Sequence, residues 1–438
     1  MDWNSAAEIR KATQGYRKKI WALTSGSHTI SDQQKATARD LPVKGPLWVS
    51  KFTIATPEED EALSLLIRTI DDMCVGGEKY VRPTFVATDA EWTGYRAGVG
   101  NDAKEPSISE KDKYNEMMKE VSSPVVVIMN SPSAYRKTFA TFAQKTKGRT
   151  FCVRQRLAPQ NPFPFALADI FLGYLSLISP PPGSPHQPIQ PSSIVLAGDS
   201  SGANLCIALT QLLLRIRQRT PTIRFHGKLV DLALPAGVTG VSAVFDVGNC
   251  LPSVVSNAEN DYIPQFPFSI QDRQPTCELW PSNPPRGNLY CDISMLCHPL
   301  VSPSLCKDWS GSPPIWLVNG QEQVVDSVKI LVQTAARQGV PVVFKEYEAM
   351  PHYFTTVFAQ SPQSKKVWDE WVHVVKDLGE GKGLASRAIF VEANGLVERE
   401  GDVEAVTTLK YEEAYKIIRE KVDRYWVFTG QNSNGSRL

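Results

Sequence analysis

The feature that most constrains the fold is an alternation of short apolar runs and helix-like segments between residues 46 and 347. The runs expected to form strands are 46–55, 125–129, 150–154, 193–197, 240–245, 314–319 and 341–347. They are almost continuously apolar, as in "VVVIM" and "PIWLVN", which is typical of strands buried on both faces of a parallel sheet. Segments with helical periodicity lie between or just after them, at 135–147, 164–178, 202–217, 326–338 and 364–376. This order predicts an α/β fold with a mostly parallel, doubly wound sheet.

Composition divides the 438 residues into three parts. Residues 1–40 are expected to form an N-terminal helical cap segment, and residues 41–378 the α/β domain. A proline- and aromatic-rich excursion at 247–313 interrupts this domain, and so long an irregular insertion is usually functional or a small subdomain. Residues 379–438 form a charged C-terminal extension, with an apolar stripe that predicts a terminal helix at 411–426.

The overall composition excludes several classes of function. Forty-seven basic against 46 acidic residues give a net charge of +1, which argues against a nucleic-acid partner. No apolar run approaches the ~18 residues of a membrane span, and residues 1–4 do not resemble a secretory signal, so we expect a cytoplasmic or membrane-peripheral protein. The eight cysteines lack metal-ligand spacing, so no metal site is expected. Most should be core residues, while one or two disulfides would fit an oxidising compartment.

The N-terminal segment has one apolar side, formed by Ile9, Tyr16, Ile20 and Leu23, with its basic residues mostly elsewhere. Two interpretations fit this pattern. The helix could lie on a membrane surface as a peripheral contact, or it could cover part of a globular core. The second arrangement is the more common one.

The most specific chemical signal is Gly198-Asp199-Ser200-Ser201-Gly202, between a strand-like and a helix-like segment. A serine hydroxyl becomes a useful nucleophile only when it is held exposed beside a base. A sharp strand-to-helix turn can present it, provided that the residues two positions away on either side are small. Ser200 is therefore the candidate nucleophile, and the N–H of Ser201 would point at the developing oxyanion. An ordinary glycine-rich turn is the non-catalytic alternative.

A base and an acid are expected to follow in the order Ser, Asp or Glu, His. His352 comes after the predicted strand 341–347, on a loop opened by Pro351, where an imidazole could reach the serine. The loop after strand 314–319 offers Glu322 and Asp326. Glu322 lies just past the strand end, whereas Asp326 suits the cap of the next helix, so Glu322 is the preferred acid and Asp326 the alternative.

Three motifs together resemble one known family. "GDSSGANL", "RLAPQNPFPFALAD" (156–169) and "YEAMPHYF" (347–354) are similar to the hormone-sensitive-lipase-like esterases of the α/β-hydrolase fold, and more narrowly to fungal steryl acetyl hydrolase-like members. The resemblance covers about residues 80–375. It implies a serine esterase or lipase that acts on acyl esters of apolar alcohols, such as sterol or lipid esters, without a cofactor. It also implies that Ser200, Glu322 and His352 are catalytic and that Arg156 and Asp169 are structural.

One departure from this family bears on activity. Its members carry a His-Gly-Gly segment after the third strand, whose N–H groups complete the oxyanion hole. Here "PVVVIM" runs directly into "NSPSAYRKTFA" (130–140), so the segment is missing and Asn130 is the candidate replacement donor. Three explanations are open: a weakened esterase, a catalytically silent protein that binds an apolar ligand or partner, and a misplaced splice boundary.

The leading hypothesis is hydrolysis of a small apolar ester. Aromatic residues of the excursion could line its pocket, and the candidates are Tyr262, Phe266 and Trp280. The alternative is an impaired hydrolase-fold protein that binds an apolar ligand, because a fold does not determine an activity.

Overall fold

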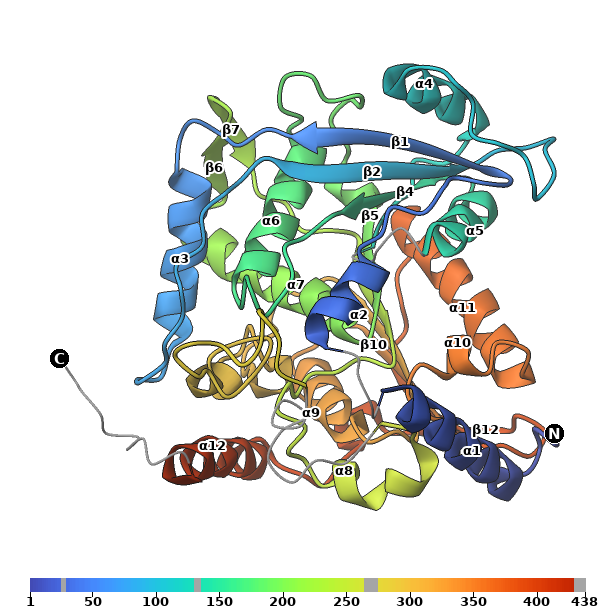
Figure 1. The fold of residues 1–438 in the computed structure, drawn as a ribbon, viewed down its shortest axis with the longest axis vertical. Coiled ribbons are helices and arrows are strands. Elements are labelled where there is room, and N and C mark those ends of the chain that lie inside the picture. The colour runs from blue at the N-terminus through green and yellow to red at the C-terminus, as the bar shows by residue number, and fades with distance from the viewer. Residues whose placement is uncertain (25–28, 130–134, 264–274, 429–438) are drawn as a thin grey trace.

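A computed structural model describes residues 1–24, 29–129, 135–263 and 275–428. Its main feature is a ten-stranded sheet (Figure 1). In spatial order the strands are β1 (Leu47–Ile54), β2 (Thr88–Tyr95), β4 (Arg149–Val153), β3 (Val126–Met129), β5 (Ile194–Asp199), β8 (Gly237–Val241), β9 (Ile315–Gly320), β10 (Val342–Tyr347), β11 (Arg387–Val391) and β12 (Glu398–Gly401). From β4 to β11 all neighbouring strands are parallel. The prediction of a mostly parallel sheet is therefore confirmed.

Helices cover both faces of this sheet (Figure 1). One core contains residues of α3 (Glu61–Met73), α6 (Phe165–Ile178), α7 (Ser201–Arg219), α9 (Val325–Ala336) and α12 (Tyr411–Phe428). The other contains residues of α1 (Ala6–Thr24), α5 (Arg136–Thr146), α10 (Phe354–Val357) and α11 (Pro362–Gly379). The remaining helices are α2 (Ile30–Thr37), α4 (Glu110–Glu120) and α8 (Ser253–Ser256).

The continuous apolar character of the central strands is explained by these two cores. Val126 and Ile128 of β3 belong to the core of α6 and α7, whereas Val127 and Met129 belong to that of α5 and α11. Successive side chains of a strand point to opposite faces, so a strand covered on both sides must be apolar at every position. The carboxyl ends of β5, β9 and β10 lie at one edge of the sheet, and the loops that follow them carry the candidate site residues.

Some expectations about strands were wrong in detail. The run at 46–55 forms a strand, but β1 pairs antiparallel with β2, which in turn pairs antiparallel with β4. The strand expected at 240–245 is Gly237–Val241, because Ser242 has a φ of 49° and turns the chain out of the sheet. Sequence analysis also missed the hairpin of β6 (Thr222–Phe225) and β7 (Lys228–Asp231).

The segments before and after the central domain contribute to its core and to its sheet. Strands β11 and β12 fall within the segment 379–438 and extend the main sheet beyond β10, so the boundary at 378 does not separate two sheets. In the described part of the excursion 247–313 the chain forms α8 and short 3₁₀ turns, including Ala258–Asn260 and Ile293–Cys297. The N-terminal helix α1 buries Ile9 completely, which favours the interpretation of a helix that covers the core.

The structure pairs none of the eight cysteines in a disulfide, and five of them are buried. Among the described helices, none combines the length and the apolar character that crossing a bilayer would require.

Candidate active site

Ser200 lies at the tip of a sharp turn between β5 and α7. Its backbone has φ 51° and ψ −119°, a left-handed conformation that an L-residue rarely adopts, so the turn is strained. A Cβ atom placed on Gly198 would lie 2.5 Å from the carbonyl carbon of Gly202. Glycine is therefore required at position 198 for the helix to approach the strand this closely. This local geometry is the one predicted from the spacing of the two glycines.

The structure brings Ser200, His352 and Glu322 together from three separate loops. The Nε2 atom of His352 is 2.9 Å from the Oγ atom of Ser200, and its Nδ1 atom is 2.5 Å from Oε2 of Glu322. An ionised carboxylate can only accept, so the hydrogen-bond network assigns the Nδ1 proton to the bond with Glu322. Nε2 is then free to accept the hydroxyl proton of Ser200.

Glu322, rather than Asp326, is the carboxylate next to His352. The Oε1 atom of Glu322 accepts hydrogen bonds from Asn319 Nδ2 at 2.7 Å and from the N–H of Gly320 at 3.1 Å. Its side chain is fully buried, which fixes its orientation toward the imidazole. Asp326 instead accepts from the N–H of Ser253 at 2.8 Å. It lies in the first turn of α9, but the N-cap residue of this helix is Val324, so the expectation that Asp326 caps the helix was wrong.

Burial and charge shift the pKa values of this cluster. Burial alone would lower the pKa of His352, but the charge and hydrogen bond of Glu322 outweigh it, helped by Asp261 and Asp199, so the pKa is raised. Burial raises the pKa of Glu322, against the influence of His352. Burial also raises the pKa of Asp199 to about 6, again opposed by His352. Strongly perturbed groups of this kind are characteristic of functional sites.

Of the two candidate oxyanion donors, Ser201 lies within the described residues and Asn130 does not. Ser201 is the first residue of α7, where backbone N–H groups have no acceptor within the helix. Its position beside Ser200 is the one expected for an oxyanion-hole donor. Asn130, with the whole segment 130–134, lies outside the described residues.

A cavity of about 310 Å³ opens beside Ser200. Its lining is mainly apolar, with Leu157, Ala166, Leu205, Val244, Val247 and Tyr290. Two of the aromatic residues expected to line a pocket do not line this cavity. Trp280 is buried elsewhere in the excursion, and Tyr262 packs edge-on against Tyr16 of α1. Phe266 lies outside the described residues.

The wall of this cavity at residues 155–158 is held by ionic and hydrogen-bond contacts. Asp169 of α6 accepts from Arg156 through both its guanidinium, at 2.6 Å, and its backbone N–H, at 2.7 Å. Gln34 of α2 donates to the carbonyl oxygen of Ala158 at 2.6 Å. Arg156 and Asp169 therefore have the structural role that the resemblance implied, and α2 supports the same loop from outside.

A profile of the α/β hydrolase fold family matches residues 125–356, which include Ser200, Glu322 and His352. The chain belongs to this family. The α/β-hydrolase fold predicted from the sequence motifs is thereby confirmed.

Two curated relatives of this hydrolase carry related names. An esterase of Acinetobacter venetianus is 29% identical over 239 residues, covering 54% of this chain and 67% of the relative. An acetyl-hydrolase of Streptomyces hygroscopicus is 25% identical over 240 residues, covering 54% of this chain and 68% of the relative.

Solved structures share the fold of this hydrolase at low sequence identity. A mutant esterase superimposes with a TM-score of 0.54 at 18% identity, covering 82% of this chain and 97% of its own. A hormone-sensitive lipase from a metagenome library superimposes with a TM-score of 0.52 at 17% identity, covering 85% and 98%.

Sequence analysis of this hydrolase missed some residues of the site. Asp199 precedes the nucleophile, and the only available signal was a charged side chain at the end of a buried strand. Asn204 donates through Nδ2 to the carbonyl oxygens of Val244 and Val301, at 2.8 and 3.1 Å, and so holds two loops beside the cavity. Within the described ranges, no three His, Cys, Asp or Glu side chains are grouped as metal ligands would be.

Proposed function

We propose that this protein hydrolyses carboxylic esters, with Ser200 as nucleophile, His352 as general base and acid, and Glu322 as the carboxylate that orients His352. The observation that carries the proposal is the position of His352, hydrogen-bonded to Ser200 at 2.9 Å and to Glu322 at 2.5 Å. A serine next to an oriented imidazole at a strained strand-to-helix turn is the arrangement required for acyl transfer. The names of the two curated relatives, an esterase and an acetyl-hydrolase, support the same reaction class.

The reaction proceeds in two half-reactions. The Oγ atom of Ser200 attacks the ester carbonyl carbon while Nε2 of His352 takes the hydroxyl proton. The tetrahedral intermediate collapses, the alcohol leaves with the proton returned by His352, and an acyl-serine ester remains. Water, deprotonated by His352, then attacks the acyl carbon, and Ser200 leaves with the proton as the carboxylic acid is released. Glu322 stabilises the imidazolium in both halves.

Charge on the carbonyl oxygen requires hydrogen-bond donors. The proposal assigns one to the N–H of Ser201, at the start of α7, where the helix dipole favours negative charge. Asn130 is proposed as a second donor in place of the missing glycine segment. Inserting His-Gly-Gly after Met129 tests this point: kcat should stay unchanged if Asn130 supplies the second donor, whereas a kcat raised by ~10²–10³ would show that this donor is missing.

The cavity beside Ser200 supports substrates with an apolar acyl or alcohol group. Its volume of about 310 Å³ is at the lower end of the ~300–1,000 Å³ typical of small-molecule sites. Leu157, Leu205 and Val247 offer it an apolar surface. Esters of apolar alcohols, including sterol esters, are therefore the proposed substrates.

The test is release of p-nitrophenol from acetyl, butyryl and octanoyl esters, together with hydrolysis of cholesteryl acetate. Ser200→Ala should lose ~10⁶-fold in kcat, because loss of the nucleophile removes the covalent route. Ser310→Ala, an exposed serine of the excursion, is the matched control and should keep full activity. Equal rates for the wild type and Ser200→Ala would exclude the proposed reaction.

A further inference from the structure

A second buried carboxylate, Asp261, lies behind the candidate triad on the excursion. It is fully buried, and no step of the proposed reaction uses it. Its Oδ2 atom accepts from the N–H of Gln323 at 2.9 Å, next to Glu322. Its Oδ1 atom accepts from the backbone N–H of His352 at 3.3 Å and from the backbone N–H of Tyr262 at 2.7 Å. One side chain therefore hydrogen-bonds to the backbone of both loops that carry the acid and the base.

Neighbouring residues of the same turn strengthen this connection. Asn257 Nδ2 donates to the carbonyl oxygen of Glu322 at 3.1 Å. Gln323 Nε2 donates to the carbonyl oxygen of Ile263 at 2.6 Å. The segment 257–263 thus contacts the Glu322 loop through both side chains and backbone.

Helix α1 holds this turn from the other side. Arg10, Gln14 and Arg17 are spaced by four and three residues and so lie on one face of the helix. Arg10 Nε donates to Asn260 Oδ1 at 2.8 Å, and Gln14 Nε2 donates to the carbonyl oxygen of Glu259 at 2.7 Å. Arg17 donates to the carbonyl oxygens of Ala258 and Asp261. The polar face of α1 is thus occupied by the turn that presents Asp261.

We propose that Asp261 is a positioning residue that fixes the Glu322 and His352 loops relative to each other, and that α1 holds it there. The inference rests on the proposed function of the triad. An error of about 1 Å in the position of a catalytic group can lower the rate ~10²-fold, so a shared anchor for two loops has a direct effect on kcat. The N-terminal helix then contributes to the chemistry of a site to which it gives no catalytic group.

Asp261 also acts on His352 through its charge. The acidic groups that raise the pKa of His352 are Glu322, Asp261 and Asp199, whereas burial lowers it. An anchor that worked through hydrogen bonds alone would leave this pKa unchanged when the carboxylate is neutralised. The pKa of His352 is therefore a readout that a purely structural role of Asp261 would not move.

The test compares Asp261→Asn with Asp292→Asn. Asp292 is a half-buried carboxylate of the same excursion that accepts from Ser294, so it controls for loss of a carboxylate that caps a backbone N–H. We expect Asp261→Asn to lower kcat ~10–100-fold with little change in KM, and to lower the pKa of His352. The pKa is measured by NMR titration of ¹⁵N-labelled histidine, with the His352 signal assigned from His352→Gln. Asp292→Asn should change neither value.

A second pair of variants tests the helix without altering the carboxylate. Arg17→Gln should lower kcat by ~10-fold at constant KM, whereas Lys18→Gln, an exposed residue of the same helix and charge, should not. This pair decides the question if Asp261→Asn does not fold. Equal activity of Arg17→Gln and Lys18→Gln would overturn the role of α1, and a kcat of folded Asp261→Asn equal to that of Asp292→Asn would overturn that of Asp261. An inactive wild type would instead refute the proposed function, while the NMR titration still tests Asp261.

Discussion

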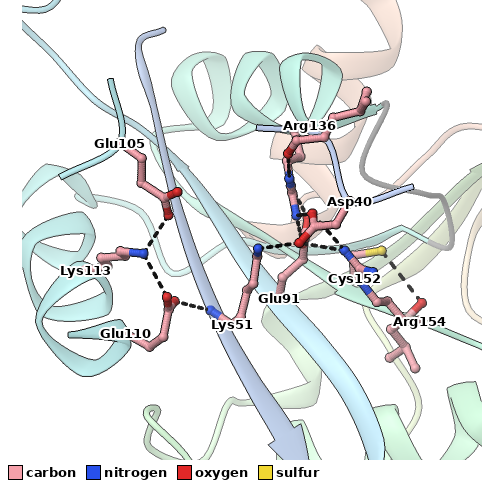
Figure 2. A network of polar contacts seen from close by, with 11 residues as sticks. Asp40, Lys51, Glu91, Glu105, Glu110, Lys113, Arg136, Cys152 and Arg154 are labelled. Atoms are coloured by element: carbon pink, nitrogen blue, oxygen red, sulfur yellow. Dashed lines mark hydrogen bonds and ion pairs between the residues drawn. The ribbon is translucent and has the colours of Figure 1, made fainter. Parts of the chain in front are cut away.

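His352 and Arg136 are both buried, but the charges around them are balanced in opposite ways. Arg136, at the start of α5, binds Glu91 of β2 at 2.6 Å and Asp40 at 2.7 Å, and Arg154 and Lys51 also pair with Asp40 (Figure 2). Three cations thus meet two carboxylates. Around His352, three carboxylates act on one imidazole.

The pKa values follow this difference. Burial alone would raise the pKa of Asp40, but hydrogen bonds from Lys51 and Arg136 outweigh it and lower the pKa to about 2. Asp199, which is mostly buried but lacks this compensation, has its pKa raised to about 6. Removing one partner from a paired network of the first kind destabilises a fold, whereas a poorly compensated cluster of the second kind is useful for proton transfer. The comparison therefore separates a structural network from a candidate catalytic one.

The sharpest test of this separation is Glu322→Gln. A glutamine cannot stabilise the imidazolium, and its amide allows the wrong imidazole tautomer, so kcat should fall ~10⁴-fold. The free energy of unfolding, measured in urea, should decrease by a much smaller proportion than kcat does. A loss of kcat below tenfold would mean that Glu322 does not orient His352.

The corresponding experiment in the charge network around Arg136 is Glu91→Gln. It leaves the buried guanidinium of Arg136 with Asp40 as its remaining carboxylate partner, so the free energy of unfolding should fall by about 3–5 kcal/mol. The kcat of the folded fraction should stay near the wild-type value. Glu116→Gln, which breaks an exposed pair with Lys119, is the control and should cost less than about 1 kcal/mol. Equal losses for both variants would contradict a stabilising role for the buried network.

The pH dependence of kcat/KM tests the charge balance around His352. Because the pKa of His352 is raised above the usual value of a histidine, the neutral base should be lost, and activity with it, as the pH falls through this raised pKa. Asp199→Asn removes one of the charges that raise this pKa. It should therefore shift the acid limb to lower pH. An acid limb that shifts to higher pH in this variant would contradict the assigned sign.

The smallest effect is expected for Asp326→Asn, at the alternative acid. Asp326 accepts from the N–H of Ser253 and does not hydrogen-bond to His352, so its replacement should cost the value of one hydrogen bond, about 0.5–1.5 kcal/mol of stability. The kcat should stay within a few-fold of the wild type. A loss as large as that of Glu322→Gln would reassign the acid.

Much of the fold was predictable because its signals are local. An almost continuous run of apolar residues is typical of a strand covered on both faces, and the seven runs of this kind correspond to β1, β3, β4, β5, β8, β9 and β10. β2 was missed because "TDAEWTGY" mixes polar and apolar residues, and β11 and β12 were missed because they lie in a charged segment. Polar and charged positions carry little information about which strand they will pair with.

The sequence by itself determined seven strands of the sheet, the strained turn at Ser200 and the loop that carries His352, because each depends on neighbouring residues or on a short period. Only the tertiary structure decided that Glu322 rather than Asp326 meets His352, and that Asp261 connects their loops to α1. These contacts join residues 30 to more than 200 positions apart in the chain. Such pairings depend on how strands and loops pack in three dimensions, and no local pattern encodes them.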